Sequence, residues 1–157
     1  MSIVGVVVEA GKAAGVSLLG QRVDFLATGG QSKRCSIFEL SVSPGFDVGA
    51  HYHGTMEEFF YVLEGEMRLA CGERVVRGGP GTFVFVPPGV AHSYGNPGTG
   101  AARVLLVTSP PGFEKYFEEM AALMAQHGRL HPDALAELRA RYDTIQISAP
   151  PAAPQNT

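Results

Sequence analysis

Residues 45–65 read GFDVGAHYHGTMEEFFYVLEG, and residues 81–96 read GTFVFVPPGVAHSYGN. The first segment contains His51 and His53, two positions apart, with glycines on either side. Alternate residues of a β-strand point to the same face, so the two imidazoles can reach one metal ion. Both segments are short apolar runs between glycines and prolines, which predicts strands joined by turns.

Glu58 and His92 complete a set of four possible metal ligands. Glu58 has the wrong parity for the strand of His53, so we expect residues 54–57 to form a tight connection followed by a hairpin return. Glu58 then lies opposite His53, because cross-strand neighbours are about 5 Å apart. His92 arrives on a separate strand after a Pro-Pro-Gly turn. Three neutral imidazoles and one carboxylate suit Fe(II), Mn(II), Ni(II) or Zn(II), which predicts one divalent transition metal ion bound by His51, His53, Glu58 and His92.

Glycine and proline punctuate the rest of the chain as well, with 20 Gly and 11 Pro among 157 residues. No helix-length periodic stretch interrupts residues 16–108, which argues against alternating strands and helices. Strands of this length with such turn signals are typical of an all-β sandwich or barrel. The apolar runs are Cys35–Val42, Glu58–Leu63, Met67–Cys71, Thr82–Val86, Val90–Tyr94 and Ala102–Thr108.

The two quoted segments resemble the two motifs of the cupin superfamily. The first motif, G-x5-H-x-H-x(3,4)-E-x6-G, is filled over residues 45–65, and the second, G-x5-P-x-G-x2-H-x3-N, over residues 81–96. The first motif admits Glu57 or Glu58, and the six-residue step to Gly65 favours Glu58. Strand parity favours it too, so Glu57 is expected to point away from the metal. The resemblance implies a double-stranded β-helix, a jelly-roll barrel with the metal inside near one mouth.

After residue 111 the pattern becomes helical. Apolar residues recur at three- and four-residue spacings over residues 113–124, which predicts a helix that ends at Gly128. Pro132 is placed to open a second helix, with Leu138 on its apolar side. Neither helix is long enough to be stable alone, so each must pack on the barrel or on another subunit.

These patterns divide the chain into three parts. The cupin barrel covers residues 1–111, and a short C-terminal α-helical extension of the same domain covers residues 112–147. Residues 148–157, SAPPAAPQNT, are small, polar and Pro-rich, which predicts a disordered tail. The extension resembles the tail of single-domain cupins of the quercetin 2,3-dioxygenase-like type.

Composition argues against two classes of partner. The net charge is −3 and no Lys/Arg cluster forms a stripe, which argues against nucleic acid. The apolar run Ile3–Val8 has no basic residues before it and is too short to span a bilayer, so we expect no membrane partner and a cytoplasmic protein. We interpret this run as a strand or as a surface against a partner subunit. Cys35 and Cys71 lack C-x-x-C spacing and are interpreted as small buried hydrophobes.

The residues beside the ligands suggest an apolar pocket. Phe60 and Val62 share the ligand face of the Glu58 strand, and Tyr94 shares a face with His92. We predict that Phe60, Val62 and Tyr94 bind the substrate; for Tyr94 the alternative, an aromatic that fills the barrel, is favoured over contact with a metal-bound ligand. The same face could also carry Met67, Leu69 and Phe85. Such a pocket suits a small, largely apolar or aromatic molecule.

The opposite face of the same strand is apolar too. Phe59, Tyr61 and Leu63 point away from the ligands, and an apolar face of this kind needs a cover. The cover could be a helix, the N-terminal strand or a second subunit. We therefore predict a homodimer.

Three functions are compatible with this site. The resemblance implies a quercetinase-like, metal-dependent dioxygenase that acts on an aromatic or enol-type substrate, with Glu58 as the catalytic general base. The same centre could instead act without oxygen, as in an isomerase, lyase, decarboxylase or cyclase. A non-enzymatic small-molecule-binding cupin is the third alternative, because this barrel hosts many functions.

Overall fold

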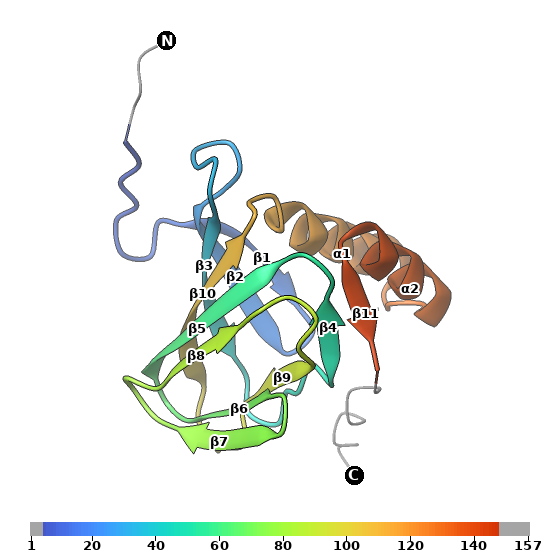
Figure 1. The fold of residues 1–157 in the computed structure, drawn as a ribbon. Coiled ribbons are helices and arrows are strands. Elements are labelled where there is room, and N and C mark those ends of the chain that lie inside the picture. The colour runs from blue at the N-terminus through green and yellow to red at the C-terminus, as the bar shows by residue number, and fades with distance from the viewer. Residues whose placement is uncertain (1–4, 148–157) are drawn as a thin grey trace.

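The computed structural model describes residues 5–147, which form two β-sheets and two helices (Figure 1). Sheet A has the strand order β1-β2-β3-β10-β5-β8, and sheet B has the order β11-β4-β9-β6-β7. The predicted disordered tail, 148–157, lies outside the described residues. The strands are β1 (Ala14–Leu18), β2 (Gln21–Ala27), β3 (Ser36–Val42), β4 (His51–His53), β5 (Glu57–Glu64), β6 (Met67–Cys71), β7 (Arg74–Gly78), β8 (Phe83–Val86), β9 (His92–Gly95), β10 (Ala102–Ser109) and β11 (Thr144–Gln146).

From β4 to β10 the chain passes repeatedly between the two sheets. Strands β5, β8 and β10 belong to sheet A, whereas β4, β6, β7 and β9 belong to sheet B. Each strand pair is antiparallel, and buried residues alternate with more exposed ones along β3 and β10. Residues of one parity therefore face the barrel interior. The connectivity is that of a double-stranded β-helix, and the predicted fold class is confirmed.

The N-terminal run differs from the prediction in its described part. Residues 5–8 belong to no strand and are exposed, and the first strand begins at Ala14. A β-strand needs a hydrogen-bonded neighbour, and residues 5–8 pair with none of the described strands. The strand interpretation of Ile3–Val8 is therefore wrong for residues 5–8, while residues 3 and 4 lie outside the described part.

Both C-terminal helices form where the sequence predicts them. Helix α1 (Glu114–His127) ends at Gly128, which adopts φ 68° and donates its N–H to the Met124 carbonyl at 2.8 Å. A left-handed residue at this position is a common helix terminator, and glycine adopts it without steric cost. Helix α2 (Pro132–Arg141) begins with proline, whose missing N–H is not needed in the first turn.

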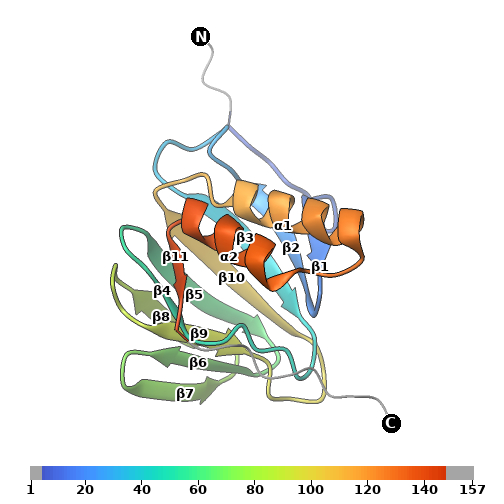
Figure 2. The ribbon, with the colours of Figure 1, turned by 90° about the vertical axis from the view of Figure 1, so that its right-hand side faces the viewer.

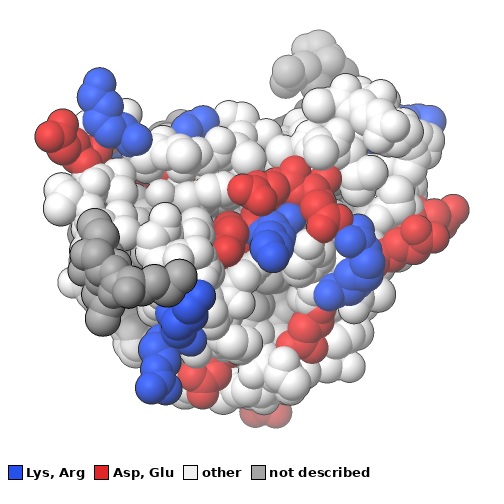
Figure 3. Space-filling view, turned by 90° about the horizontal axis from the view of Figure 1, so that it is seen from above, with Lys and Arg blue, Asp and Glu red and all other residues white. Residues whose placement is uncertain are grey.

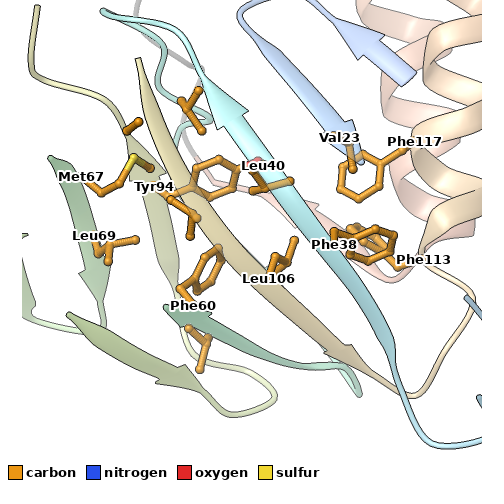
Figure 4. Packing of buried hydrophobic residues seen from close by; sticks show 14 of the residues in the cluster. Val23, Phe38, Leu40, Phe60, Met67, Leu69, Tyr94, Leu106, Phe113 and Phe117 are labelled. Atoms are coloured by element: carbon orange, nitrogen blue, oxygen red, sulfur yellow. The ribbon is translucent and has the colours of Figure 1, made fainter. Parts of the chain in front are cut away.

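The two helices cover the part of sheet A that sheet B leaves open. They lie in front of β1, β2 and β3 in Figure 2, beside the strands of sheet B. Phe113 and Phe117 point from the start of the helical segment toward Phe38 (Figure 4), with the rings of Phe38 and Phe117 5.3 Å apart. Leu138 of α2 is fully buried. The helices pack on the barrel, and apolar burial holds them there.

Between the sheets lies a second group of buried side chains. Phe60 of β5 and Tyr94 of β9 come from opposite sheets, and their rings are 5.5 Å apart (Figure 4). Met67 and Leu69 of β6 are buried beside them. This group fills the barrel on the side of β6, so any space for a ligand must lie toward the helices.

Basic and acidic side chains are interspersed on the face of the molecule seen from above (Figure 3). Arg103 forms two ion pairs, with Glu39 at 2.8 Å and with Glu64 at 3.1 Å. Neither helix in the described part of the chain has the length and apolarity needed to cross a membrane.

Candidate metal centre

Three strands bring the four predicted ligands together. His51 and His53 lie on β4, and His92 lies on β9, where it is the register partner of His51. Glu58 lies on β5, which belongs to the other sheet. The expected hairpin between β4 and β5 is therefore wrong: the connection crosses between sheets, and Glu58 approaches His53 across the barrel. Glu58 is buried in the centre, whereas Glu57 is outside it.

The four side chains form a tight buried cluster. One ligand atom from each of His51, His53, Glu58 and His92 lies within 4.8 Å of the others. Glu58 Oε2 is 2.7 Å from His92 Nε2 and 3.5 Å from His53 Nε2. The rings of His51 and His92 have centroids 4.3 Å apart. Separations of this size leave a common point that a single ion can share.

Each histidine ring is oriented by a backbone carbonyl. The Nδ1 atoms of His51, His53 and His92 lie 3.0, 2.9 and 2.9 Å from the carbonyl oxygens of Gly49, Asp143 and Val90, respectively. A protonated Nδ1 donates to each carbonyl, which leaves the Nε2 lone pair free. All three histidines therefore present the same nitrogen to the centre, as metal-binding histidines commonly do.

The electrostatics of the cluster shift the pKa values of His51 and His53 in opposite directions. Burial, aided by the neighbouring His92, lowers the pKa of His51 to about 4. Burial would also lower the pKa of His53, but the nearby Glu58 carboxylate outweighs it and raises that pKa above 6.5. Burial alone would raise the pKa of Glu58, whereas its contacts with His53 and His92 hold it well below its usual range. Glu58 is therefore an anion, and His51 stays neutral over the physiological range.

The residues fit a divalent transition metal ion. The buried Nε2 atoms of His53 and His92 and Oε2 of Glu58 make no hydrogen bond of good geometry to a described group. Buried polar atoms are normally satisfied, so these three point to a missing partner at their common centre. Three imidazole nitrogens and one carboxylate can hold Fe(II), Mn(II), Ni(II) or Zn(II), and the donor set alone does not select among them.

Asp143 is a functional residue that the sequence analysis missed. Its backbone carbonyl accepts the hydrogen bond from His53, and its carboxylate accepts the backbone N–H groups of Gly54, Thr55 and Met56 at 2.8, 2.7 and 3.1 Å. These bonds fix the connection between His53 and Glu58, and they hold the pKa of Asp143 below its usual range although burial opposes this. Asp143 lies some 90 residues from His53 in sequence, and no local pattern marks it.

A cavity of about 490 Å³ opens beside the centre and is the size of a small-molecule site. His51, His53 and Glu58 lie in its wall, together with mostly apolar residues of the β1–β2 turn, the segment before β4, both helices and β11. Helices α1 and α2 thus form one side of the cavity, and the barrel mouth forms the other.

Of the three predicted substrate-binding residues, one lies in the cavity wall and two lie in the core. Tyr94 lines the cavity, and its hydroxyl donates to Gln21 Oε1 at 3.0 Å. Phe60 and Val62 are buried in the core and are not part of the cavity wall. The substrate-binding role of all three stays a prediction.

Phe85 does not lie on the ligand side. It is the cross-strand partner of Phe59, stacks on that ring with centroids 4.9 Å apart and is 41% exposed. Cross-strand partners share a face, so the outward orientation of Phe59 requires the same of Phe85. Met67 and Leu69 do point into the barrel, where they form part of the core.

Comparison with known proteins agrees with this architecture. Residues 38–108 match the Cupin domain family. Quercetin 2,3-dioxygenase of Bacillus subtilis (strain 168) is 33% identical over 70 residues, which are 45% of this chain and 20% of that protein. The tetracenomycin polyketide synthase protein TcmJ of Streptomyces glaucescens is 31% identical over 71 residues, which are 45% of this chain and 48% of that protein.

Solved structures add evidence on the fold. The structure of KdgF from Halomonas sp. has a TM-score of 0.61 and 15% identity, and the match covers 69% of this chain and 96% of that one. The matched segments span between 20% and 61% of the length of the curated relatives. The interleaved sheets, the buried His-His-Glu-His cluster and the family match together show a cupin domain, with residues 38–108 matching the family.

Proposed function

We propose that the protein is a metal-dependent dioxygenase that acts on a small aromatic or enol-type substrate bound in the cavity. One observation carries the proposal: a buried centre of three histidines and one glutamate contributes His51, His53 and Glu58 to the wall of a mostly apolar cavity. A divalent ion held there would offer an open coordination position to an anionic substrate oxygen. The mostly apolar wall suits the remainder of an aromatic molecule.

Glu58 is the residue proposed to move a proton. Its carboxylate is anionic, faces the cavity and lies 2.7 Å from His92 Nε2. If the Glu58 carboxylate detached in part from a bound ion, it would accept the proton of a substrate hydroxyl as a general base.

The surrounding residues exclude water and orient the substrate. Phe113 contacts His53, with ring centroids 5.7 Å apart, and closes the helix side of the centre. Tyr94 stays protonated, because burial raises its pKa, and its hydroxyl proton is engaged by Gln21. Its oxygen can still accept a hydrogen bond from a ligand. Phe60 and Val62 are proposed to act from beneath the wall, where they support the position of the bound molecule.

The curated relatives support this choice without deciding it. A quercetin 2,3-dioxygenase is among them, and its name specifies oxygen chemistry on an aromatic enol. The match covers only 20% of that protein, so activity and substrate are both part of the proposal. An isomerase, lyase, decarboxylase or cyclase uses the same centre without oxygen, and a binding protein uses it without turnover.

Oxygen uptake tests the proposal. Protein loaded separately with Fe(II), Mn(II), Ni(II) or Zn(II) is mixed with a panel of flavonols and related enols, and uptake is followed with an oxygen electrode. We expect uptake with at least one metal, and we expect Glu58→Gln to lower kcat by about 100-fold or more, as loss of a general base does. Glu57→Gln is the matched control, because that neighbour lies outside the centre.

The other outcomes of these measurements distinguish the dioxygenase from the alternative functions. No uptake with any metal contradicts the dioxygenase. Turnover of an enol under strict anaerobiosis indicates a non-oxidative enzyme, and tight binding of a cellular metabolite without turnover indicates a binding protein.

We propose that the protein is a homodimer that buries the outer face of sheet A. Tyr61, Phe83 and Phe85 are 44%, 58% and 41% exposed on this face, and the helices lie on the opposite one. Contiguous exposed aromatics commonly mark a protein interface, and a copy of the same face offers a matching apolar surface. Sedimentation equilibrium is expected to give twice the chain mass, and Phe83→Lys is expected to halve it. A wild-type mass near one chain contradicts the dimer.

We also propose that the protein works in the cytoplasm. Cys35 and Cys71 are both free thiols, and unpaired cysteines suit a reducing compartment. Fractionation of cells that express the protein tests this location.

A further inference from the structure

Arg139 is a cation in the wall of the cavity. It lies near the end of α2, and it lines the cavity together with Leu135 from the same helix. The Nε atom is buried and has no hydrogen-bond partner among the described residues. No described carboxylate lies within ion-pair distance of it. A partly buried guanidinium without an anionic partner is costly, which calls for a ligand that supplies one.

The other charges in the wall do not neutralise Arg139. Among the described residues that line the cavity, it is the single Lys or Arg side chain. Glu58 belongs to the metal centre. Asp47 is already engaged, since Oδ1 accepts the Gly49 N–H at 2.8 Å and Oδ2 lies 3.5 Å from Arg68.

A short chain of aromatic contacts joins Arg139 to the metal centre. Its guanidinium neighbours the hydroxyl of Tyr116 and opposes the rise in the pKa of Tyr116 that burial causes. The Tyr116 ring stacks on Phe113 with centroids 4.7 Å apart, and Phe113 lies 5.7 Å from His53. Two flat rings therefore separate the cation from the ligands, and both also line the cavity.

We propose that Arg139 binds a carboxylate of the substrate, so that the cavity takes an apolar or aromatic molecule with a metal-binding oxygen at one point and a carboxylate at another. This inference rests on the proposed function and adds a chemical class to its substrate. The planar fork of a guanidinium matches a carboxylate with two parallel hydrogen bonds. A phosphate ester carries nearly two charges and commonly needs more than one cation, and this wall holds a single one.

Arg139 could instead serve only to hold α2 against Tyr116. The two explanations differ in what substitution does. A structural Arg139 affects the stability of the helix and the binding of all ligands alike, whereas a carboxylate-binding Arg139 affects acids and spares their neutral esters. Ligand charge therefore separates the two roles.

The test compares 3,4-dihydroxycinnamate with its methyl ester. Both carry a catechol on a flat apolar frame, and they differ in the charge of the far group. Their Kd values are measured by isothermal titration with the zinc-loaded protein, which is redox-inactive, and with the metal-free protein. We expect the wild type to prefer the acid by about tenfold to hundredfold in both forms, since a charged hydrogen-bonded pair is worth that much. Arg139→Gln is expected to abolish the preference, and Arg139→Lys to retain part of it.

Arg141→Gln is the matched control. It removes the same charge from the same helix, but Arg141 is outside the cavity and pairs with Glu119 at 2.6 Å. The preference is expected to survive in this variant. Equal affinity for acid and ester, no measurable binding of the acid, or a preference that persists in Arg139→Gln overturns the proposal. Failure of the metal chemistry looks different, because zinc then leaves the affinity of both probes unchanged while the acid is still preferred.

Discussion

The motif region, residues 45–96, and the C-terminal segment, residues 112–146, meet at one site but contribute different things. The motif region supplies the four ligand side chains, all from strands that lie within the matched family segment. The C-terminal segment supplies the carbonyl that orients His53, the wall of aromatic rings and the cation Arg139. The metal centre thus belongs to the common barrel, while the cavity beside it is shaped by the segment outside the family match.

The largest expected effect is a loss of bound metal when ligand histidines of the motif region are replaced. In His51→Ala plus His92→Ala, two of three nitrogen donors are lost, and metal content is expected to fall from about one ion per chain to nearly none. Elemental analysis of protein purified without chelators measures this. His127→Ala plus His131→Ala is the control, because those two histidines are exposed on the C-terminal segment and are not part of the centre. Unchanged metal content in the first variant refutes the site.

Weakening the packing of the C-terminal segment on the barrel is expected mainly to lower the free energy of unfolding. Leu138→Ala removes a fully buried side chain that fastens α2 to the barrel, and the free energy of unfolding is expected to fall by about 2–5 kcal/mol. Denaturant titration measures the loss, with Leu19→Ala as the control, since Leu19 is 75% exposed. The folded variant should still bind metal. A loss as small as that of the control means that the helix contributes little to the fold.

The ligands could be predicted because their spacing is local. Strand parity places His51 and His53 on one face and selects Glu58 over Glu57, and these relations depend on backbone geometry within a few residues. The helix ends at Gly128 and Pro132 follow from equally local conformational preferences.

What failed depends on contacts between distant segments. The spacing of His53 and Glu58 fits either a hairpin or a crossing between sheets, and only the partners of β4, which are β9 and β11, distinguish them. Phe85 was misplaced because its face is set by the register with Phe59 on another strand. Asp143 contacts Gly54, which lies 89 residues away in the sequence, and no periodic pattern in the sequence indicates such a contact.

Asp143 is where the two regions depend on each other most directly. Asp143→Asn keeps the shape and tolerates the left-handed backbone at φ 52°, but it loses the charge that receives three N–H groups of the 54–56 connection. Metal affinity is expected to fall about 10–100-fold, as is usual for residues that orient ligands. Competition with a zinc-binding dye measures it. Asp133→Asn is the control, because Asp133 lies in the first turn of α2, away from the connection. Equal affinities in the two variants would mean that the connection holds its shape without Asp143.

The smallest expected effect is a dependence on pH that arises from both regions. In the metal-free protein, Glu58 raises the pKa of His53, so the ion pair stabilises the fold below about pH 6.5, and this contribution is lost as the pH rises through the folded-state pKa of His53. Metal binding requires neutral imidazoles and must displace that proton, whereas His51, with a pKa of about 4, has none to release. Titration at pH 6.5 in buffers of different ionisation enthalpy is therefore expected to show that metal binding releases the His53 proton. Apparent affinity is expected to rise with pH until the His53 pKa is passed. In Glu58→Gln the carboxylate that holds the His53 proton is gone, and the release should shrink. If the wild type releases no proton, the assignment of His53 as the protonated partner of Glu58 is wrong.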